Sequence, residues 1–302
     1  MTSTQFSDLV ISEEIRDALL TERPLVALES TVITHGLPFP QNLVLAGQME
    51  DRVREFGAIP ATIALVDGKI KVGVTDQDLN NLAVNPDVHK ISVRDIGPAL
   101  AMGWSGGTTV ASTSLIAYMA GIRVFATGGI GGVHREPPFD ISADLPQLAK
   151  TPIIVVCAGA KAILDLPATL EVLETSSVPV VGYQTDSFPA FYSVSSGLPV
   201  SVRADQPEQV AHIARRHWKL GLKSAVLVTA PPPQTAALPA DEVQSAIDQA
   251  LREAVVENIR GQAMTPYLLS KVNESTQGAS LKANLALLLN NAQIAAQIAV
   301  EL

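Results

Sequence analysis

A lysine at the end of a strongly apolar segment is the residue best placed for covalent chemistry. Lys161 follows the apolar run 152–158 and a Gly-Ala pair, and the chain has only nine lysines in 302 residues. The run is typical of a buried strand, and open parallel sheets bind their ligands at the carboxyl ends of strands. A lysine there can bind an anion, or it can attack a carbonyl as a neutral amine and form an imine. The residues alone leave both roles open.

Imine formation requires an uncharged amine. Lowering a lysine pKa from about 10.4 towards 7 needs roughly 4–5 kcal/mol of preference for the neutral form. Burial beside a second cation, for which Lys90 is the candidate, would supply it. Glu29 ends another apolar segment. Desolvation there would raise the pKa of its carboxyl group and suit it to donate a proton, and a salt bridge is the alternative.

The segment Gly106-Gly-Thr-Thr-Val-Ala-Ser-Thr113 is the best candidate for anion binding. Glycines let backbone N–H groups approach a ligand, and the hydroxyls and the N-terminus of the helix that follows would favour negative charge. An ordinary glycine turn with capping hydroxyls is the alternative. A second glycine segment, 128–132, approaches a dinucleotide fingerprint, but His134 stands where the third glycine belongs, so no such site is predicted. His134 itself can be a ligand or a hydrogen-bonded loop histidine.

Two carboxylates stand four residues apart in Asp140-Ile-Ser-Ala-Asp144, with Ser142 between them. Hard oxygen ligands suit Mg²⁺ or Mn²⁺, which keep several waters and use only one or two carboxylates. A solvated helix cap is the alternative. The spacing does not decide which of the two aspartates would be the direct ligand.

Alternation of strands and helices must position these residues. It predicts an α/β fold over residues 1–302 as a single domain, with a mainly parallel sheet flanked by helices on both faces. Asp67-Gly68 predicts a type I′ hairpin inserted in this pattern. The predicted strands are 25–29, 61–66, 69–73, 90–94, 123–127, 152–158, 178–183 and 224–229. The predicted helices are 11–22, 40–56, 76–82, one after the glycine loop that ends at 121, 161–175, 207–220, 241–259 and 281–298.

Composition limits the partners and the compartment. The net charge of −9 argues against a nucleic acid polymer as partner. Cys157 is the only cysteine, so no internal disulfide can form, which fits the cytoplasm. The first eight residues lack the basic and apolar regions of a signal peptide. The sequence has no uninterrupted apolar run of about 18 residues, so we expect no membrane span.

Several long motifs resemble the pseudouridine-5′-phosphate glycosidase family. They are Ala27-Leu-Glu-Ser-Thr-Val-Ile-Thr-His-Gly36, Gly57-Ala-Ile-Pro-Ala-Thr-Ile63, Gly103-Trp-Ser-Gly-Gly-Thr-Thr-Val-Ala-Ser-Thr113, Ala126-Thr-Gly-Gly-Ile-Gly-Gly-Val-His-Arg135, Asp140-Ile-Ser-Ala-Asp144, Cys157-Ala-Gly-Ala-Lys161 and Tyr183-Gln-Thr-Asp-Ser-Phe-Pro-Ala-Phe-Tyr192. The resemblance extends from about Ile11 to Ile298. It implies reversible cleavage of the C–C glycosidic bond of pseudouridine 5′-phosphate to ribose 5-phosphate and uracil, with Mn²⁺ as cofactor and a homotrimeric assembly.

The resemblance also implies roles for individual residues. Lys161 matches the lysine that forms an imine with the sugar, and Glu29 matches the proton donor. The other matched positions are Lys90, Thr109, Val110, His134, Ser142, Ala143, Asp144 and Asn284 as substrate contacts, and Asp140 as the metal ligand. Two other functions are compatible with an active lysine: a different Schiff-base lyase acting on a sugar phosphate, and a phosphosugar-binding protein without catalytic activity.

Overall fold

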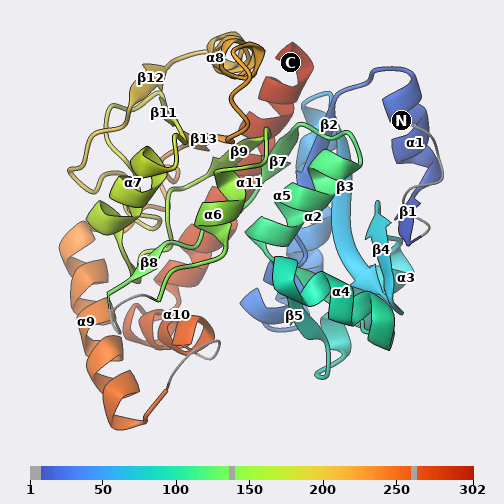
Figure 1. Cartoon of the computed structure of the whole chain (residues 1–302). Helices are drawn as coiled ribbons and strands as arrows, with labels where there is room; N and C mark the ends of the chain where they lie inside the picture. Colours follow the sequence, from blue (N-terminus) through green and yellow to red (C-terminus); the bar gives the residue numbers. More distant parts are fainter. Residues whose placement is uncertain (1–7, 136–139, 260–263) are drawn as a thin grey trace.

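The fold is built on one large twisted sheet. The computed structural model describes residues 8–135, 140–259 and 264–302 (Figure 1). Among the described residues the sheet has eleven strands. Nine of them lie in the order β1-β4-β3-β2-β7-β9-β13-β11-β12, and the other two, β5 and β6, branch from β3, because β6 pairs with both β3 and β5. The strands of the large sheet are β1 (Leu9–Ile11), β2 (Leu25–Leu28), β3 (Ile59–Val66), β4 (Lys69–Val72), β5 (His89–Ile91), β6 (Gly106–Thr108), β7 (Val124–Ala126), β9 (Ile154–Cys157), β11 (Val180–Tyr183), β12 (Val202–Ala204) and β13 (Val226–Thr229). Strands β8 (Val133–His134) and β10 (Leu164–Asp165) form a separate antiparallel pair.

The centre of the sheet is parallel and buried on both faces. Strands β2, β7, β9, β13 and β11 pair in parallel, and every residue of β2, β9 and β13 is buried. Strands covered on both faces need continuous apolar sequence, which is why these segments read as uninterrupted Val, Ile, Leu and Ala runs. The prediction of a mainly parallel sheet is confirmed.

The predicted hairpin forms between β3 and β4. Val66 pairs with Lys69, and Asp67 and Gly68 have φ angles of 50° and 71°, as a type I′ turn requires. The first strand of the hairpin is also a member of the main sheet, because the first half of β3 pairs in parallel with β2. The second half of β3 pairs antiparallel with β4 and β6. The hairpin therefore extends the sheet and connects it to the β5–β6 pair.

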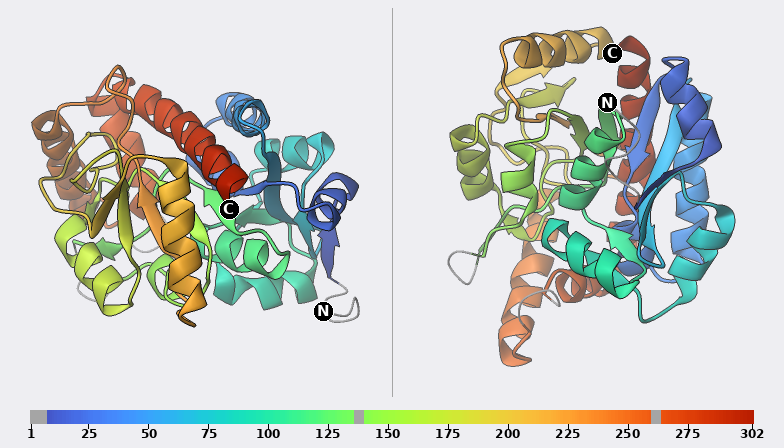
Figure 2. Two further views of the ribbon diagram at one scale, coloured as in Figure 1. Left: turned by 90° about the horizontal axis from the view of Figure 1, so that it is seen from above. Right: turned by 45° about the vertical axis from the view of Figure 1, so that its right-hand side comes forward.

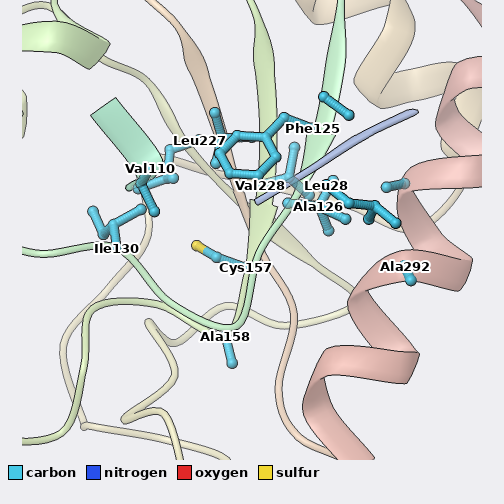
Figure 3. Close-up of a cluster of buried hydrophobic side chains, with 14 of the residues drawn as sticks. Leu28, Val110, Phe125, Ala126, Ile130, Cys157, Ala158, Leu227, Val228 and Ala292 are labelled. Atoms are coloured by element: carbon cyan, nitrogen blue, oxygen red, sulfur yellow. The ribbon is translucent and has the colours of Figure 1, made fainter. Parts of the chain in front are cut away.

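Helices cover both faces of the sheet. The helices are α1 (Glu13–Leu20), η1 (Val32–Gly36, a π-helical turn), α2 (Gln41–Glu55), α3 (Asp76–Val84), α4 (Val93–Met102), α5 (Val110–Met119), α6 (Asp144–Leu148), α7 (Leu166–Thr175), α8 (Pro207–Lys219), α9 (Ala240–Val256), α10 (Met264–Ser275) and α11 (Ala279–Glu301). Seen from above, α2 and α11 lie on one side of the strands and α5 lies on the other (Figure 2). Figure 3 shows Phe125, Cys157 and Val228 of the sheet between Val110 of α5 and Ala292 of α11.

Helix α11 is the central helix of its layer. Among the described residues it is the helix that is long and apolar enough to cross a membrane, but 56% of its apolar window is buried inside the protein. It packs against α2, α8 and the strands β2, β7 and β9. Its apolar sequence is accounted for by this packing.

Three sequence-based boundaries are wrong in an informative way. The glycine segment 106–108 is a strand rather than a loop, and the predicted strand 90–94 ends at Ile91 because Ser92 caps α4. The helix predicted from residue 161 begins at Leu166 instead. Residues 1–7, on which the expectation of no signal peptide partly rests, lie outside the described ranges.

Candidate active site

The structure brings almost all of the predicted site residues to one cavity. The cavity has a volume of about 430 Å³ and lies beyond the carboxyl ends of β2 and β9. All but one of the predicted site residues line it. The lining residues among them are Glu29, Lys90, Thr109, Val110, His134, Asp140, Ser142, Ala143, Asp144 and Lys161. The exception is Asn284, which lies in the second turn of α11 and is not among the lining residues.

Lys161 reaches the cavity through a tight turn after β9. Its backbone N–H donates to the carbonyl of Ile130 over 3.1 Å, and the N–H of Ile130 donates to the carbonyl of Gly159 over 3.1 Å. Gly159 has a φ of +89°, and a Cβ atom there would come within 2.5 Å of the Pro189 carbonyl oxygen. Only glycine fits this position. The Gly-Ala pair before the lysine therefore has a structural reason.

Glu29 lies at the end of β2 and faces the same cavity. The hydroxyl of Thr127, at the end of the adjacent strand β7, donates a short hydrogen bond to its Oε1. Burial raises the pKa of the Glu29 carboxyl, and Asp144 adds to the increase, while Lys161, Thr127 and Lys90 oppose it. The expected desolvation of this carboxyl is confirmed, and a group of this kind holds its proton at higher pH than an exposed glutamate.

Lys90 brings a second amine to the cavity from a different part of the sheet. It lies on β5 opposite Gly107 of β6. Burial lowers the pKa of Lys90, and the charge of Lys161 lowers it further, while Asp144 and Glu29 act in the opposite direction. The charge of Lys161 inside the same cavity therefore disfavours the charged form of Lys90.

Asp144 ties two walls of the cavity together. Its Oδ1 accepts a hydrogen bond from the backbone N–H of Ala111 in the first turn of α5, and its Oδ2 accepts one from the N–H of Gly131; both distances are 2.8 Å. The side chain is buried, so these are strong charge-assisted bonds. Because both oxygens of Asp144 are engaged, Asp140 is the carboxylate better able to take a metal ion.

Residues that sequence reasoning missed also line the cavity. They are Thr31, Ser92, Arg94, Asp95, Gly131, Ile141 and Leu164. Arg94 is a guanidinium at the mouth of the cavity in the first turn of α4, and its side chain is 75% exposed. The pattern Ser92-Val-Arg-Asp95 is a capping-box sequence, and it would have placed a helix start, and with it Arg94, beside Lys90.

Comparison with known proteins gives relatives over the full chain. Residues 14–301 match the family model described as indigoidine synthase A like protein. The chain is 51% identical over 300 residues to pseudouridine-5′-phosphate glycosidase of Caldanaerobacter subterraneus, covering 99% of this chain and 97% of that protein. It is 54% identical to the protein of the same name from Paracoccus denitrificans, covering 96% of this chain and 97% of that one.

The chain belongs to the pseudouridine-5′-phosphate glycosidase family. A solved structure of the prealnumycin C-glycosynthase AlnA in complex with ribulose 5-phosphate shares the fold, with a TM-score of 0.91 and 43% identity over 98% of this chain and 97% of that chain. The match to the indigoidine synthase A like family model spans every described residue that lines the cavity, from Glu29 to Leu164.

Proposed function

We propose that this protein is a pseudouridine-5′-phosphate glycosidase that acts through an imine on Lys161. The observation that carries the proposal is the placement of the Lys161 amine and the Glu29 carboxyl, whose pKa burial raises, in one cavity, in a chain about half identical to relatives bearing that name. An amine and a general acid that share a cavity are the minimum set for imine chemistry on a sugar.

The proposed reaction begins with opening of the ribose ring. The C1′–O4′ bond breaks while Glu29 gives a proton to O4′, and the neutral amine of Lys161 forms a bond to C1′. The bound amine loses a proton to the Glu29 carboxylate. When the C1′–C5 bond breaks, its electron pair stays with uracil, and Glu29 gives that proton to C5. The nitrogen lone pair completes the C1′=N bond, and water then releases ribose 5-phosphate. The usual two-carboxylate logic of glycosidases does not apply, because a carbon leaving group has no oxygen to protonate.

The phosphate of the substrate is assigned to the side of the cavity formed by β5 and α5. Lys90 supplies a cation there, and Val110 is the first residue of the ten-residue helix α5. The helix dipole makes such an N-terminus favourable for an anion, and the Ala111 N–H of the same turn is already bonded to a carboxylate, that of Asp144. Ser142, Ala143 and His134 also line the cavity and are proposed as further substrate contacts.

The donor set also fits a hard divalent ion such as Mn²⁺ held mainly by water. The described residues contain no group of three or more His, Cys, Asp or Glu side chains arranged to hold a metal. Asp140 lines the cavity with a carboxylate, and Mn²⁺ and Mg²⁺ are bound through one or two carboxylates with several waters retained. Such an ion supplies positive charge near an anionic substrate. We assign Asp140 as its protein ligand.

Release of uracil from pseudouridine 5′-phosphate in the presence of Mn²⁺ tests the activity. The expected result is stoichiometric uracil and ribose 5-phosphate, with no product in the absence of protein. Trapping of ribose 5-phosphate by borohydride without any uracil release would favour a different Schiff-base lyase. Binding of ribose 5-phosphate without trapping would favour a phosphosugar-binding protein.

We also propose that the reaction runs in reverse, which the likeness to the C-glycosynthase AlnA supports. Uracil and ribose 5-phosphate incubated with the protein should give pseudouridine 5′-phosphate, because the same imine serves both directions. The family resemblance also supports a homotrimer in the cytoplasm. Light scattering coupled to size-exclusion chromatography tests the first proposal, and cell fractionation tests the second.

A further inference from the structure

Thr127 is fixed at all three of its polar groups. Its backbone N–H donates to the carbonyl of Val156 over 3.0 Å, and its own carbonyl accepts a bond of 2.9 Å from Nδ2 of Asn291 on α11. Its hydroxyl donates to Oε1 of Glu29. Thr127 is fully buried, so none of these bonds competes with bulk water. Of these three bonds, the one to the Glu29 carboxyl is the bond through which Thr127 can act on the cavity.

The segment that carries Thr127 is clamped from two sides. A Cβ atom on Gly128 would come within 3.1 Å of the Leu288 side chain of α11, and a Cβ on Gly129 within 2.5 Å of the Phe191 ring. Phe191 itself has a φ of +61°, an unfavourable conformation for an aromatic residue. Backbone strain of this kind persists only where the surroundings enforce it, and it concentrates at functional sites.

Asn291 also shows that the clamp serves Thr127. Its Nδ2 points to the carbonyls of Thr127 and Gly128, over 2.9 and 3.4 Å, while its buried Oδ1 has no hydrogen-bond partner among the described residues. A buried acceptor without a partner is costly. The amide is held in this orientation because two carbonyl groups face it, and carbonyls accept only from the NH₂ side.

We propose that Thr127, anchored by Asn291, is a positioning residue that presents the proton donor Glu29 to the substrate in one orientation. The inference rests on the proposed glycosidase function. Oε1 of Glu29 accepts the hydrogen bond from the Thr127 hydroxyl. In the protonated carboxyl Oε1 is therefore the carbonyl oxygen, and the acidic proton lies on Oε2. Rotation of the carboxyl would exchange the two oxygens, and the fixed hydroxyl opposes that rotation. The donor proton is thereby kept at one place in the cavity.

Replacement of the hydroxyl by a methyl group of nearly equal size tests the proposal. In Thr127→Val we expect kcat to fall by about 10- to 100-fold with KM changed by less than about twofold, because only the proton-transfer step loses alignment. Glu29 must be protonated to act, so activity falls as pH rises through its pKa. The Thr127 bond favours the carboxylate, so its loss raises the pKa of Glu29 further and moves the alkaline limb of kcat to higher pH.

Two variants serve as controls. Thr127→Ser keeps the hydroxyl and should keep the alkaline limb of the wild type. Thr229→Val removes a buried hydroxyl at the corresponding end of β13, which donates a long hydrogen bond of 3.4 Å to the Val181 carbonyl, and should leave the limb in place. The charged groups that act on Glu29, namely Lys161, Asp144 and Lys90, are unchanged in all three variants.

A second measurement needs no substrate. Infrared difference spectra between each protein and its Glu29→Gln variant report the C=O stretch and the titration of protonated Glu29. Thr127→Val should raise both the stretching frequency and the pKa, and Thr127→Ser should raise neither. Unchanged spectra and an unchanged alkaline limb in Thr127→Val would overturn the positioning role, as would a loss of kcat without any movement of the limb. Absence of uracil release by the wild type would refute the glycosidase proposal, and the spectra would still decide the role of Thr127.

Discussion

The carboxylate of Asp144 accepts the backbone N–H of Ala111 over 2.8 Å, and with its other oxygen it holds Gly131. One buried side chain thus joins the first turn of α5 to the segment that follows β7. The first turn of α5 borders the proposed phosphate subsite, and the segment after β7 leads to His134. The geometry of the cavity depends on this carboxylate even if it never contacts substrate.

Asp144→Asn is therefore expected to destabilise the fold. An asparagine offers one acceptor in place of two, so one buried backbone N–H loses its partner at a cost of about 1–3 kcal/mol. Urea unfolding should show this loss in the free energy of unfolding. Asp140→Asn is the matched control, and it should change the stability by less than about 0.5 kcal/mol because Asp140 is only partly buried. Equal stabilities of the two variants would contradict the clamp.

The two amines of the cavity can be separated by trapping. Ribose 5-phosphate incubated with the protein and reduced with borohydride should give an adduct that maps to Lys161 by peptide mass spectrometry. Lys161→Ala should abolish both the adduct and turnover while the circular dichroism spectrum stays unchanged. Lys161→Arg should behave in the same way, because a guanidinium keeps the charge but remains protonated. An adduct on Lys90 would show that Lys90, and not Lys161, forms the imine.

Binding of the phosphate end should depend on pH through Lys90. Its pKa is lowered by burial and by Lys161, so its charge is lost at lower pH than for an exposed lysine. Titration calorimetry of ribose 5-phosphate should show weaker binding as pH rises through that pKa. Lys161→Ala is the suitable background because it prevents imine formation, and burial, the larger of the two causes, still lowers the Lys90 pKa there.

Lys90→Met in this background should bind weakly at every pH, and Lys90→Arg should bind with little change over the same range, since arginine stays charged. A pH dependence that persists in Lys90→Met would assign the titration to another group.

The glycine strand β6 should tolerate no side chain. A Cβ atom on Gly107 would lie 2.3 Å from Oγ1 of Thr34 and 2.8 Å from the carbonyl oxygen of Ser30. Gly107→Ala should lower the free energy of unfolding by about 1–3 kcal/mol, since overpacking displaces backbone. Gly47→Ala on α2 is the contrasting variant, because nothing lies within 4 Å of the new atom there. It should stabilise the helix by about 0.5–1 kcal/mol. Thermal unfolding monitored by circular dichroism compares the two.

The buried parallel strands were predictable because their burial imposes continuous apolar sequence. The hairpin was predictable because Asp67-Gly68 is the residue pair that a type I′ turn needs. Edge strand β12 was missed because two of its three residues, Val202 and Arg203, are exposed and carry no periodic pattern. Strand β6 was missed because glycine is depleted in strands. Glycine is required there by neighbouring backbone that is distant in sequence.

The candidate site was predictable where chemistry dictates a residue type and not where partners are distant. Lys161 and Glu29 follow apolar runs, so their place beyond the carboxyl ends of buried strands could be inferred. The engagement of Asp144 could not be inferred, because its partner Ala111 lies 33 residues away. The same limit applies to Thr127, whose anchor Asn291 is separated from it by 164 positions. Sequence proximity carried no information on either contact.

The β5–β6 pair, which carries Lys90 and leads into Thr109, reaches the main sheet through β3 alone, at Ala64 and Leu65. The turn that carries Lys161 leaves the sheet several strands away. The cavity is thus lined by two segments that join the sheet at different strands: the β5–β6 pair and the turn that carries Lys161. A library with random substitutions confined to residues 86–109 could be screened for variants that accept other phosphate-bearing substrates. Lys161 and its turn would stay unchanged in every variant.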